Sequence, residues 1–128
     1  MNTPKQAVLD FINAHNSWEK VANARRGSVG DLTALKIART EYRELVSRFC
    51  ASSVEPQGVT FGDDTMHDPE REVIESVVVT GTSAIVHTKH RGDSDFVSDY
   101  EYNLIYVANE WRITSIMYVD ADGKYECL

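Results

Sequence analysis

The sequence predicts a single α+β domain in which two N-terminal helices cover a C-terminal antiparallel sheet. Apolar residues recur at helical spacing through the first 50 residues, and segments rich in Val, Ile and Thr follow from Glu72 onward. Short turn signals separate these later segments. Helices first and strands afterwards is the order typical of α+β domains. A chain of 128 residues has the length of one domain, so we assign residues 1–128 to it.

The first helix is predicted to begin at Pro4. Thr3 is a suitable N-cap, and Gln6 completes a Thr-x-x-Gln capping box. An apolar stripe follows in steps of three and four residues, at Val8, Phe11, His15, Trp18 and Ala22. We expect the helix to stop at Gly27, which can adopt the left-handed conformation of a helix end.

A second helix follows a short turn, and either Ser28 or Asp31 could cap it. Its apolar stripe has the same spacing, at Leu35, Ala38, Tyr42, Leu45 and Phe49. Two helices joined by so short a turn should pack as an antiparallel hairpin. The apolar face of that hairpin needs a cover.

Residues 52–70 are predicted to form a long loop, with room for a short strand at 59–61. Two Pro and two Gly residues punctuate it, and it carries the pairs Asp63-Asp64 and His67-Asp68. Loops of this length in a small domain are often functional.

The rest of the chain predicts a meander of five strands. Residues 73–80 and 83–89 are joined by Gly81-Thr82, which is typical of a tight hairpin. The later strands are expected at residues 96–107, 111–119 and 124–128.

The net charge of −7 resides entirely in the second half of the chain. Residues 1–64 carry eight basic and eight acidic residues, whereas residues 65–128 carry five basic and twelve acidic residues. Such a surface repels nucleic acid phosphates, so we expect no nucleic acid partner. It would attract a basic protein partner and accelerate their encounter.

Several other classes of protein are disfavoured. No apolar run approaches the roughly 20 residues that cross a bilayer, and the first six residues lack the layout of a signal peptide. We therefore expect a cytoplasmic protein with no membrane partner. Cys50 and Cys127 are far apart and in no metal-ligand spacing, so reduced thiols are expected.

Motifs of the second half carry a resemblance to a known family. They are Pro56-Gln57-Gly58, His67-Asp68-Pro69-Glu70, Tyr100-Glu101-Tyr102-Asn103-Leu104 and Tyr118-Val119-Asp120-Ala121-Asp122-Gly123-Lys124-Tyr125-Glu126. These segments resemble immunity proteins of the nuclear transport factor 2-like fold, encoded beside Rhs-type polymorphic toxins in bacteria. Trp111-Arg112-Ile113 after a turn is common in the wider superfamily. The family usually has a Gly in the turn before the Trp, where this chain has Ala108-Asn109-Glu110.

The resemblance implies a nuclear transport factor 2-like (cystatin-like) cone, with the helical hairpin packed on a curved antiparallel sheet. It also implies an immunity protein that is not an enzyme, needs no cofactor, and neutralises a cognate toxin domain by direct binding. It does not indicate which toxin is bound or which residues touch it. Sheets of this fold often pair, so a homodimer stays open.

The strand around residue 100 supplies the candidate contact surface, because side chains alternate across a strand. One face carries Asp93, Asp95, Asp99, Glu101 and Asn103. The other face carries Phe96, Tyr100, Tyr102, Leu104 and Tyr106. Like charges so close repel one another, which favours a surface offered to a basic partner. We predict that this acidic face, with Asp63 and Asp64, binds the toxin; a solvated outer face is the alternative.

Two rival functions use the aromatic face. One is a cavity enzyme of the ketosteroid isomerase or dehydratase type, in which His15 and a Tyr perform acid–base chemistry. The other is a small-molecule binding module with an empty cavity. A lone His in a helix stripe is more often a packing residue, and the faces of the carboxylates Glu72 and Asp120 are left open. An open apolar pocket would favour either rival.

A metal site is not expected. His87 and His90 are three apart on a predicted strand, so they point to opposite faces. We interpret these two residues and His67 as loop and surface histidines. Asp120-x-Asp122-Gly123 lacks the third oxygen ligand of a calcium loop and is predicted to be a turn.

Overall fold

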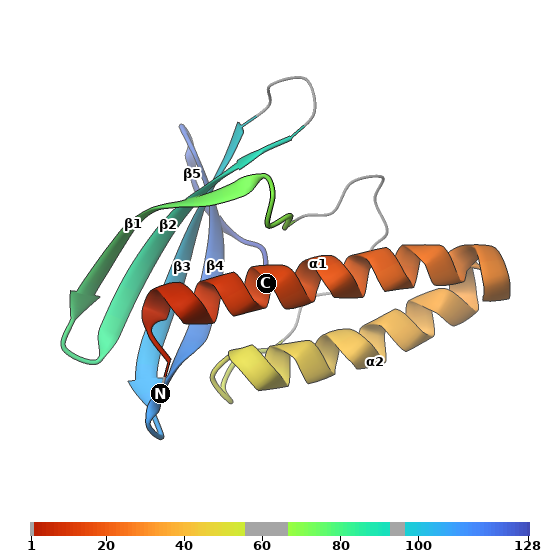
Figure 1. Cartoon of the computed structure of the whole chain (residues 1–128), viewed down its shortest axis with the longest axis horizontal. Helices are drawn as coiled ribbons and strands as arrows, with labels where there is room; N and C mark the ends of the chain where they lie inside the picture. Colours follow the sequence, from red (N-terminus) through yellow and green to blue (C-terminus); the bar gives the residue numbers. More distant parts are fainter. Residues whose placement is uncertain (1, 56–66, 93–96) are drawn as a thin grey trace.

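The computed structural model describes residues 2–55, 67–92 and 97–128. Two helices, α1 (Pro4–Val29) and α2 (Asp31–Phe49), precede β1 (Glu72–Thr80), β2 (Ser83–Arg91), β3 (Val97–Val107), β4 (Glu110–Asp120) and β5 (Gly123–Glu126). The helices run beside each other along one face of a curved sheet (Figure 1). This arrangement confirms the predicted α+β class. Neither helix is long and apolar enough to cross a membrane.

The N-cap of α1 is confirmed, whereas the predicted stop at Gly27 is wrong. The Thr3 side chain accepts a hydrogen bond from the Gln6 backbone N–H at 3.1 Å. The Gln6 side chain donates to Asp10 at 2.8 Å instead of reaching back to the cap. The helix continues to Val29 because Gly30, with a φ of 85°, takes the unusual backbone conformation that ends it.

Gly30 also stands at the start of α2, so neither Ser28 nor Asp31 provides its cap. Asp31 instead lies in the first turn of α2, 3.3 Å from the guanidinium of Arg26. With a single residue between them, the helices form the expected antiparallel hairpin. The indole N–H of Trp18 donates to the Ala38 carbonyl at 3.1 Å and ties α1 to α2.

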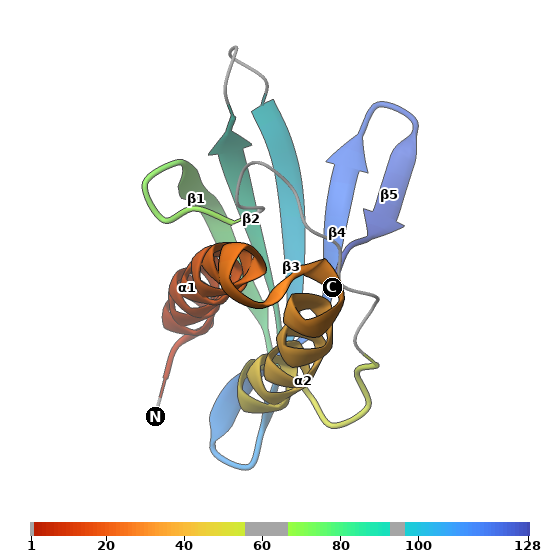
Figure 2. The same cartoon turned by 90° about the vertical axis from the view of Figure 1, so that its right-hand side faces the viewer.

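The sheet is an antiparallel meander in the order β1-β2-β3-β4-β5. The β1–β2 turn places Gly81 at a φ of 61°, and the β3–β4 turn places Ala108 and Asn109 at 52° and 66°. These values suit the tight turns of right-twisted hairpins. The strand considered at 59–61 lies outside the described residues. Seen along the helices, the hairpin lies across the inner face of the sheet (Figure 2).

The core lies between the helical hairpin and this inner face. Its bulkiest fully buried apolar side chains come from α1, β2, β3 and β4, and include Val8, Phe11, Ile12, Val86, Tyr102, Ile113 and Ile116. Burying such side chains is worth about 1.5–3 kcal/mol each before the entropy cost of ordering them.

The β4 side of the sheet is closed by segments from elsewhere in the chain. Asn2 exchanges two hydrogen bonds with the backbone of Trp111, at 2.8 and 3.1 Å. The Ala51 N–H donates to the Ile113 carbonyl at 2.8 Å, and the Cys127 N–H to the Ile116 carbonyl at 3.0 Å. β5 then pairs with the last part of β4. Both chain ends and the segment after α2 are thereby attached to one strand.

Arg112 connects β4 to the end of α2. Its guanidinium donates to the carbonyls of Ser47, Arg48 and Cys50 at 3.0, 3.4 and 2.9 Å. It also lies 2.6 Å from the Glu110 carboxylate. A cation at a helix C-terminus satisfies carbonyls that have no partner within the helix.

Replacing Arg112 with methionine keeps much of the aliphatic length but removes these donors. We expect Arg112→Met to lower the free energy of unfolding by about 1–3 kcal/mol. Urea denaturation followed by circular dichroism measures this change. The matched control, Arg39→Met on the exposed side of α2, should change it by less than about 0.5 kcal/mol. Equal effects of the two substitutions would contradict the role of Arg112.

Candidate functional site

The predicted polar face of β3 is the outer face of the sheet, turned away from the helices. Asp99, Glu101 and Asn103 share this face, while Tyr100, Tyr102 and Leu104 are buried on the inner side. The alternation predicted for this strand is therefore confirmed for its described residues. The other predicted contact residues, Asp63, Asp64, Asp93 and Asp95, lie outside the described residues, as does Phe96.

The carboxylates of this outer face are compensated by neighbouring cations. Glu101 is only 7% exposed and accepts a hydrogen bond from Lys124 at 2.9 Å. That bond lowers the pKa of Glu101, and His87 lies 3.3 Å away on its other side. Asp99 stays half-exposed, 4.0 Å from Lys89. The repulsion expected between Asp99 and Glu101 is thus offset by the lysines of β2 and β5.

The inner side of the sheet holds a buried carboxylate. Glu72 opens β1, and its side chain points into the cone, where it is fully buried. One oxygen lies 2.6 Å from Nδ1 of His67. The other accepts hydrogen bonds from the hydroxyls of Thr88 and Tyr102, both at 2.6 Å. Residues from β1, β2, β3 and the segment before β1 therefore meet at this carboxylate.

The partners of Glu72 keep it ionised. Burial by itself would raise its pKa, but the hydrogen bonds and the nearby His67 outweigh burial, so the pKa of Glu72 lies below its usual range. Burial and the Glu72 charge raise the pKa of Tyr102 well above its ordinary value. Tyr102 therefore stays a neutral donor beside an anionic acceptor, which is a strong charge-assisted arrangement.

Two histidines pack against each other above this network. The rings of His15 and His67 have centroids 4.8 Å apart at an interplanar angle of 86°. His15 also lies 2.9 Å from the Glu19 carboxylate. Both histidines are buried, at 5% and 1% exposure. The interpretation of His67 as a loop or surface histidine is therefore wrong, because the chain before β1 directs its ring toward Glu72.

Comparison with known proteins identifies the family. A family model described as "NTF2 fold immunity protein" matches residues 3–126, nearly the whole chain. The chain belongs to this family. The match supports an immunity role and agrees with the nuclear transport factor 2-like arrangement of helices and sheet. Comparisons with curated proteins and with solved structures give no match.

The interior of this immunity protein is occupied by its own side chains. Phe11 and Tyr102 are fully buried beside His67, with ring centroids 5.6 and 5.9 Å from the His67 ring. Both oxygens of Glu72 are engaged by protein groups. A hollow of about 720 Å³ lies elsewhere, between the end of α2 and the β3–β4 turn, and neither His15 nor Glu72 lines it.

His87 and His90 point to opposite faces of the sheet, as predicted, but the interpretation of His90 as a surface histidine is wrong because this residue is only 8% exposed. His87 lies on the outer face and His90 on the inner face. Among the described residues no group of three metal-ligating side chains comes together. Asp120 accepts hydrogen bonds from the N–H groups of Asp122 and Gly123, at 2.8 and 3.1 Å, and so stabilises a turn.

Sequence reasoning missed the pairing of Glu72 with His67. One usable signal was Thr88, which alternates with Ala84 and Val86 and so marks a polar group on the inner face of β2. A buried hydroxyl requires a partner. The partner itself was not identifiable from spacing, because Glu72 and Thr88 are paired only through the register of β1 and β2.

Removing the buried carboxylate should destabilise the fold strongly. Glu72→Ala leaves His67, Thr88 and Tyr102 without their common acceptor, and we expect it to lower the free energy of unfolding by about 3–5 kcal/mol. The control is Glu75→Ala on the same strand, whose exposed carboxylate lies 3.3 Å from Lys89. It should cost less than about 1 kcal/mol. Urea denaturation compares the two, and similar losses would contradict a central role for Glu72.

Stability should also fall with mild acid. Burial lowers the pKa of His15 despite the opposing Glu19, with His67 and Glu72 also facing it, and burial likewise lowers that of His90. The unfolded chain then takes up protons below about pH 6.5, before the folded chain does, so the free energy of unfolding should decrease as the pH falls from about 7 to 5.

Denaturation in urea at several pH values measures this slope. His15→Gln should make it shallower, because one of the groups that titrates only after unfolding is removed. Asn13→Gln, at an exposed position of the same helix, removes no titratable group; it is the matched control and should leave the slope as in the wild type. A His15→Gln slope identical to that of the wild type would contradict the assignment.

Proposed function

We propose that this protein neutralises a cognate bacterial toxin domain by direct one-to-one binding and performs no chemistry of its own. The observation that carries the proposal is the match to the immunity family over residues 3–126. An immunity role requires a surface that recognises one toxin tightly, and it requires no catalytic group. We further propose that the toxin is of the Rhs-type polymorphic class and that both proteins meet in the cytoplasm.

The filled interior supports binding over catalysis. Enzymes of this fold use a cavity between helices and sheet, with a titrating group at its base. Here the groups at that place, His15, His67 and Glu72, are buried and packed against one another. A general base must reach a substrate proton within hydrogen-bond distance. Glu72, the only carboxylate of this group, already uses both oxygens on protein partners and is better suited to holding the fold together.

The outer face around Asp99 is our proposed contact surface, together with Glu101 and Asn103 and the acidic residues Asp63, Asp64, Asp93 and Asp95. The excess of acidic residues in the second half of the chain supports a basic partner. Within the described part of this face, Asp99 is the more exposed carboxylate. Glu101 is held by Lys124 and helps to shape the surface. A phosphate-gripping toxin would present the complementary basic groove.

Co-expression tests the proposal directly. The C-terminal domain encoded by the gene immediately upstream is induced in a laboratory bacterium with and without this protein, and viable cells are counted. We expect rescue, together with co-purification of the two proteins. If the upstream product is toxic but unrescued, or is not toxic at all, the proposed partner is wrong.

Charge reversal tests the contact surface. Asp99→Lys should slow association with the toxin by about tenfold at low salt and make the rate less dependent on salt. Asp99 is preferable to Glu101, because Asp99 is half-exposed and 4.0 Å from Lys89, whereas Glu101 is buried and hydrogen-bonded to Lys124 at 2.9 Å. Stopped-flow or surface-binding kinetics at several salt concentrations measure the effect. The control is Glu44→Lys, at an exposed position of α2, which should leave the association rate nearly unchanged. An unchanged association rate for Asp99→Lys would exclude this face.

A further inference from the structure

The two edges of the sheet differ in how they are closed. On one side the edge strand is β5, which has only four residues, two of them charged, and the part of β4 beyond it is bonded by Asn2, Ala51 and Cys127. At the other edge, β1 pairs with β2 on one side only: its first residue, Glu72, donates its N–H to the Asp68 carbonyl at 2.8 Å, and none of the described segments bonds to the free side of Ser76–Thr80. Its last part, with β2, extends beyond the helices (Figure 1). An open apolar edge strand is a template for pairing with another strand.

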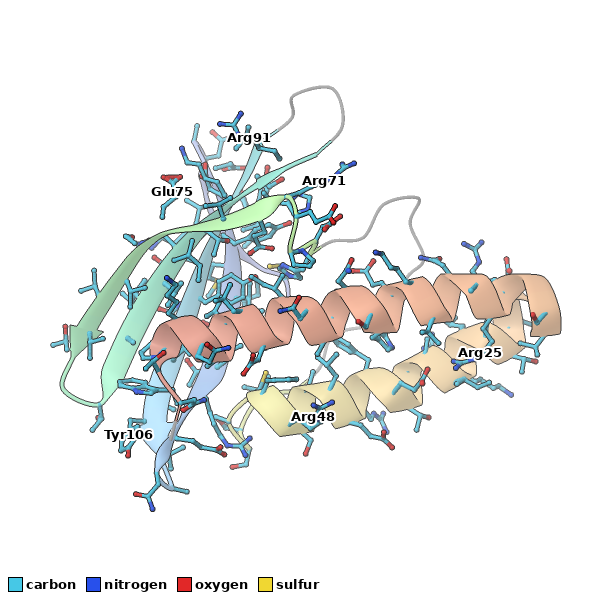
Figure 3. The ribbon with its side chains drawn as sticks, viewed as in Figure 1. Arg25, Arg48, Arg71, Glu75, Arg91 and Tyr106 are labelled. Carbon is cyan, nitrogen blue, oxygen red and sulfur yellow. The ribbon has the colours of Figure 1, made fainter. Side chains whose placement is uncertain are left out.

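The open part of β1 is apolar and uncharged. It comprises Ser76–Thr80, which we call the edge segment, with the sequence Ser-Val-Val-Val-Thr. The valines are 39%, 53% and 53% exposed at positions 77, 78 and 79. The nearest carboxylate along the strand, Glu75, lies toward the end of β1 away from the hairpin turn (Figure 3), 3.3 Å from Lys89. Exposed valines in a neutral strand with an open edge are typical of a surface that pairs with another strand.

The edge segment is symmetric about its central residue. Read in either direction it runs hydroxyl, valine, valine, valine, hydroxyl. In an antiparallel pair centred on Val78, Val77 would face Val79 of the second copy, and Ser76 would face Thr80. β-branched residues pair well across strands, and Ser and Thr hydroxyls can bond one another. Such self-complementarity is what a twofold interface between identical chains requires.

The backbone hydrogen-bonding groups of the edge segment also fit a pair centred on Val78. Gly81 and Thr82 close a two-residue hairpin, with Thr80 opposite Ser83. In such a hairpin the closing pair bonds across the two strands, and the pattern repeats every second residue. Val77 and Val79 therefore direct their N–H and C=O groups to the free edge. In the pair centred on Val78 these are the groups that meet.

We infer that two copies of this chain associate through the edge segment, joining their sheets antiparallel across a twofold axis at Val78. In this register Glu75 falls opposite Gly81 of the second copy, so the pairing brings no two carboxylates face to face. A toxin strand would need no such symmetry, and a basic toxin would find no acidic group in the edge segment. A contact of five residues on each side is small, so the dimer should dissociate on dilution.

Sedimentation velocity over a range of protein concentrations tests the inference. The wild type should shift with concentration from 14.4 kDa toward twice that mass. Val78→Lys and Val78→Glu each place like charges opposite one another, and each should weaken association about tenfold or more. Val73→Glu makes the same kind of change on the same strand outside the edge segment, and it should dimerise like the wild type. Circular dichroism confirms that the variants fold.

Mixing the two Val78 variants decides the register. A lysine at position 78 then faces a glutamate, so the equimolar mixture should recover the dimer that neither variant forms alone. A wild type that stays at 14.4 kDa at all concentrations would overturn the inference. So would a dimer that survives in Val78→Lys, or a mixture that fails to associate. Loss of toxin binding in Val78→Lys with a monomeric wild type would assign the edge to the toxin instead. Because no toxin is needed for the first measurements, they stand independently of the proposed function.

Discussion

The ionised carboxylate of Glu72 is the constraint on which the interior of this protein depends. A buried anion is costly unless it is fully hydrogen-bonded, and here three side chains supply the bonds. Thr88 and Tyr102 come from the two strands that follow β1, and His67 comes from the segment that precedes it. Satisfying this one group therefore sets where the chain enters the sheet and brings an imidazole into the core.

Because the interior is filled by its own side chains, the stability of this immunity protein and its recognition of a toxin can depend on different residues. The fold must persist while its contact surface changes with the toxin, and a surface diverges more easily when it carries no part of the core. On the outer side of the sheet, charged residues contact one another, as Lys124 does with Glu101, and this contact does not involve the network around Glu72. We expect substitutions there to alter charge and shape without disturbing that network.

The two edges of the sheet differ in how well they are protected from pairing with further strands. One edge ends in the four-residue strand β5, which carries Lys124 and Glu126, and the rest of β4 is bonded by Asn2 and the segment after α2. A short, charged edge strand is a poor template for further strands. The other edge ends in the neutral edge segment Ser76–Thr80, which has no such protection among the described residues. Natural sheets usually protect open edges with charge, proline or a covering segment. An unprotected apolar edge strand is a template for pairing with another strand. The symmetry of the edge segment favours a second copy of this chain as the partner.

Local spacing in the sequence determined the helical hairpin, the meander and the inner and outer sides of β3, because periodicity acts over a few residues. It misplaced the end of α1, since Gly27 and Gly30 are equally suitable locally. Only the tertiary structure decided the face of Glu72. The bulge between Ile74 and Ser76 reverses the alternation of β1, so counting back from Val79 would put Glu72 outside. Its partners meet it only through strand register, which no local pattern encodes.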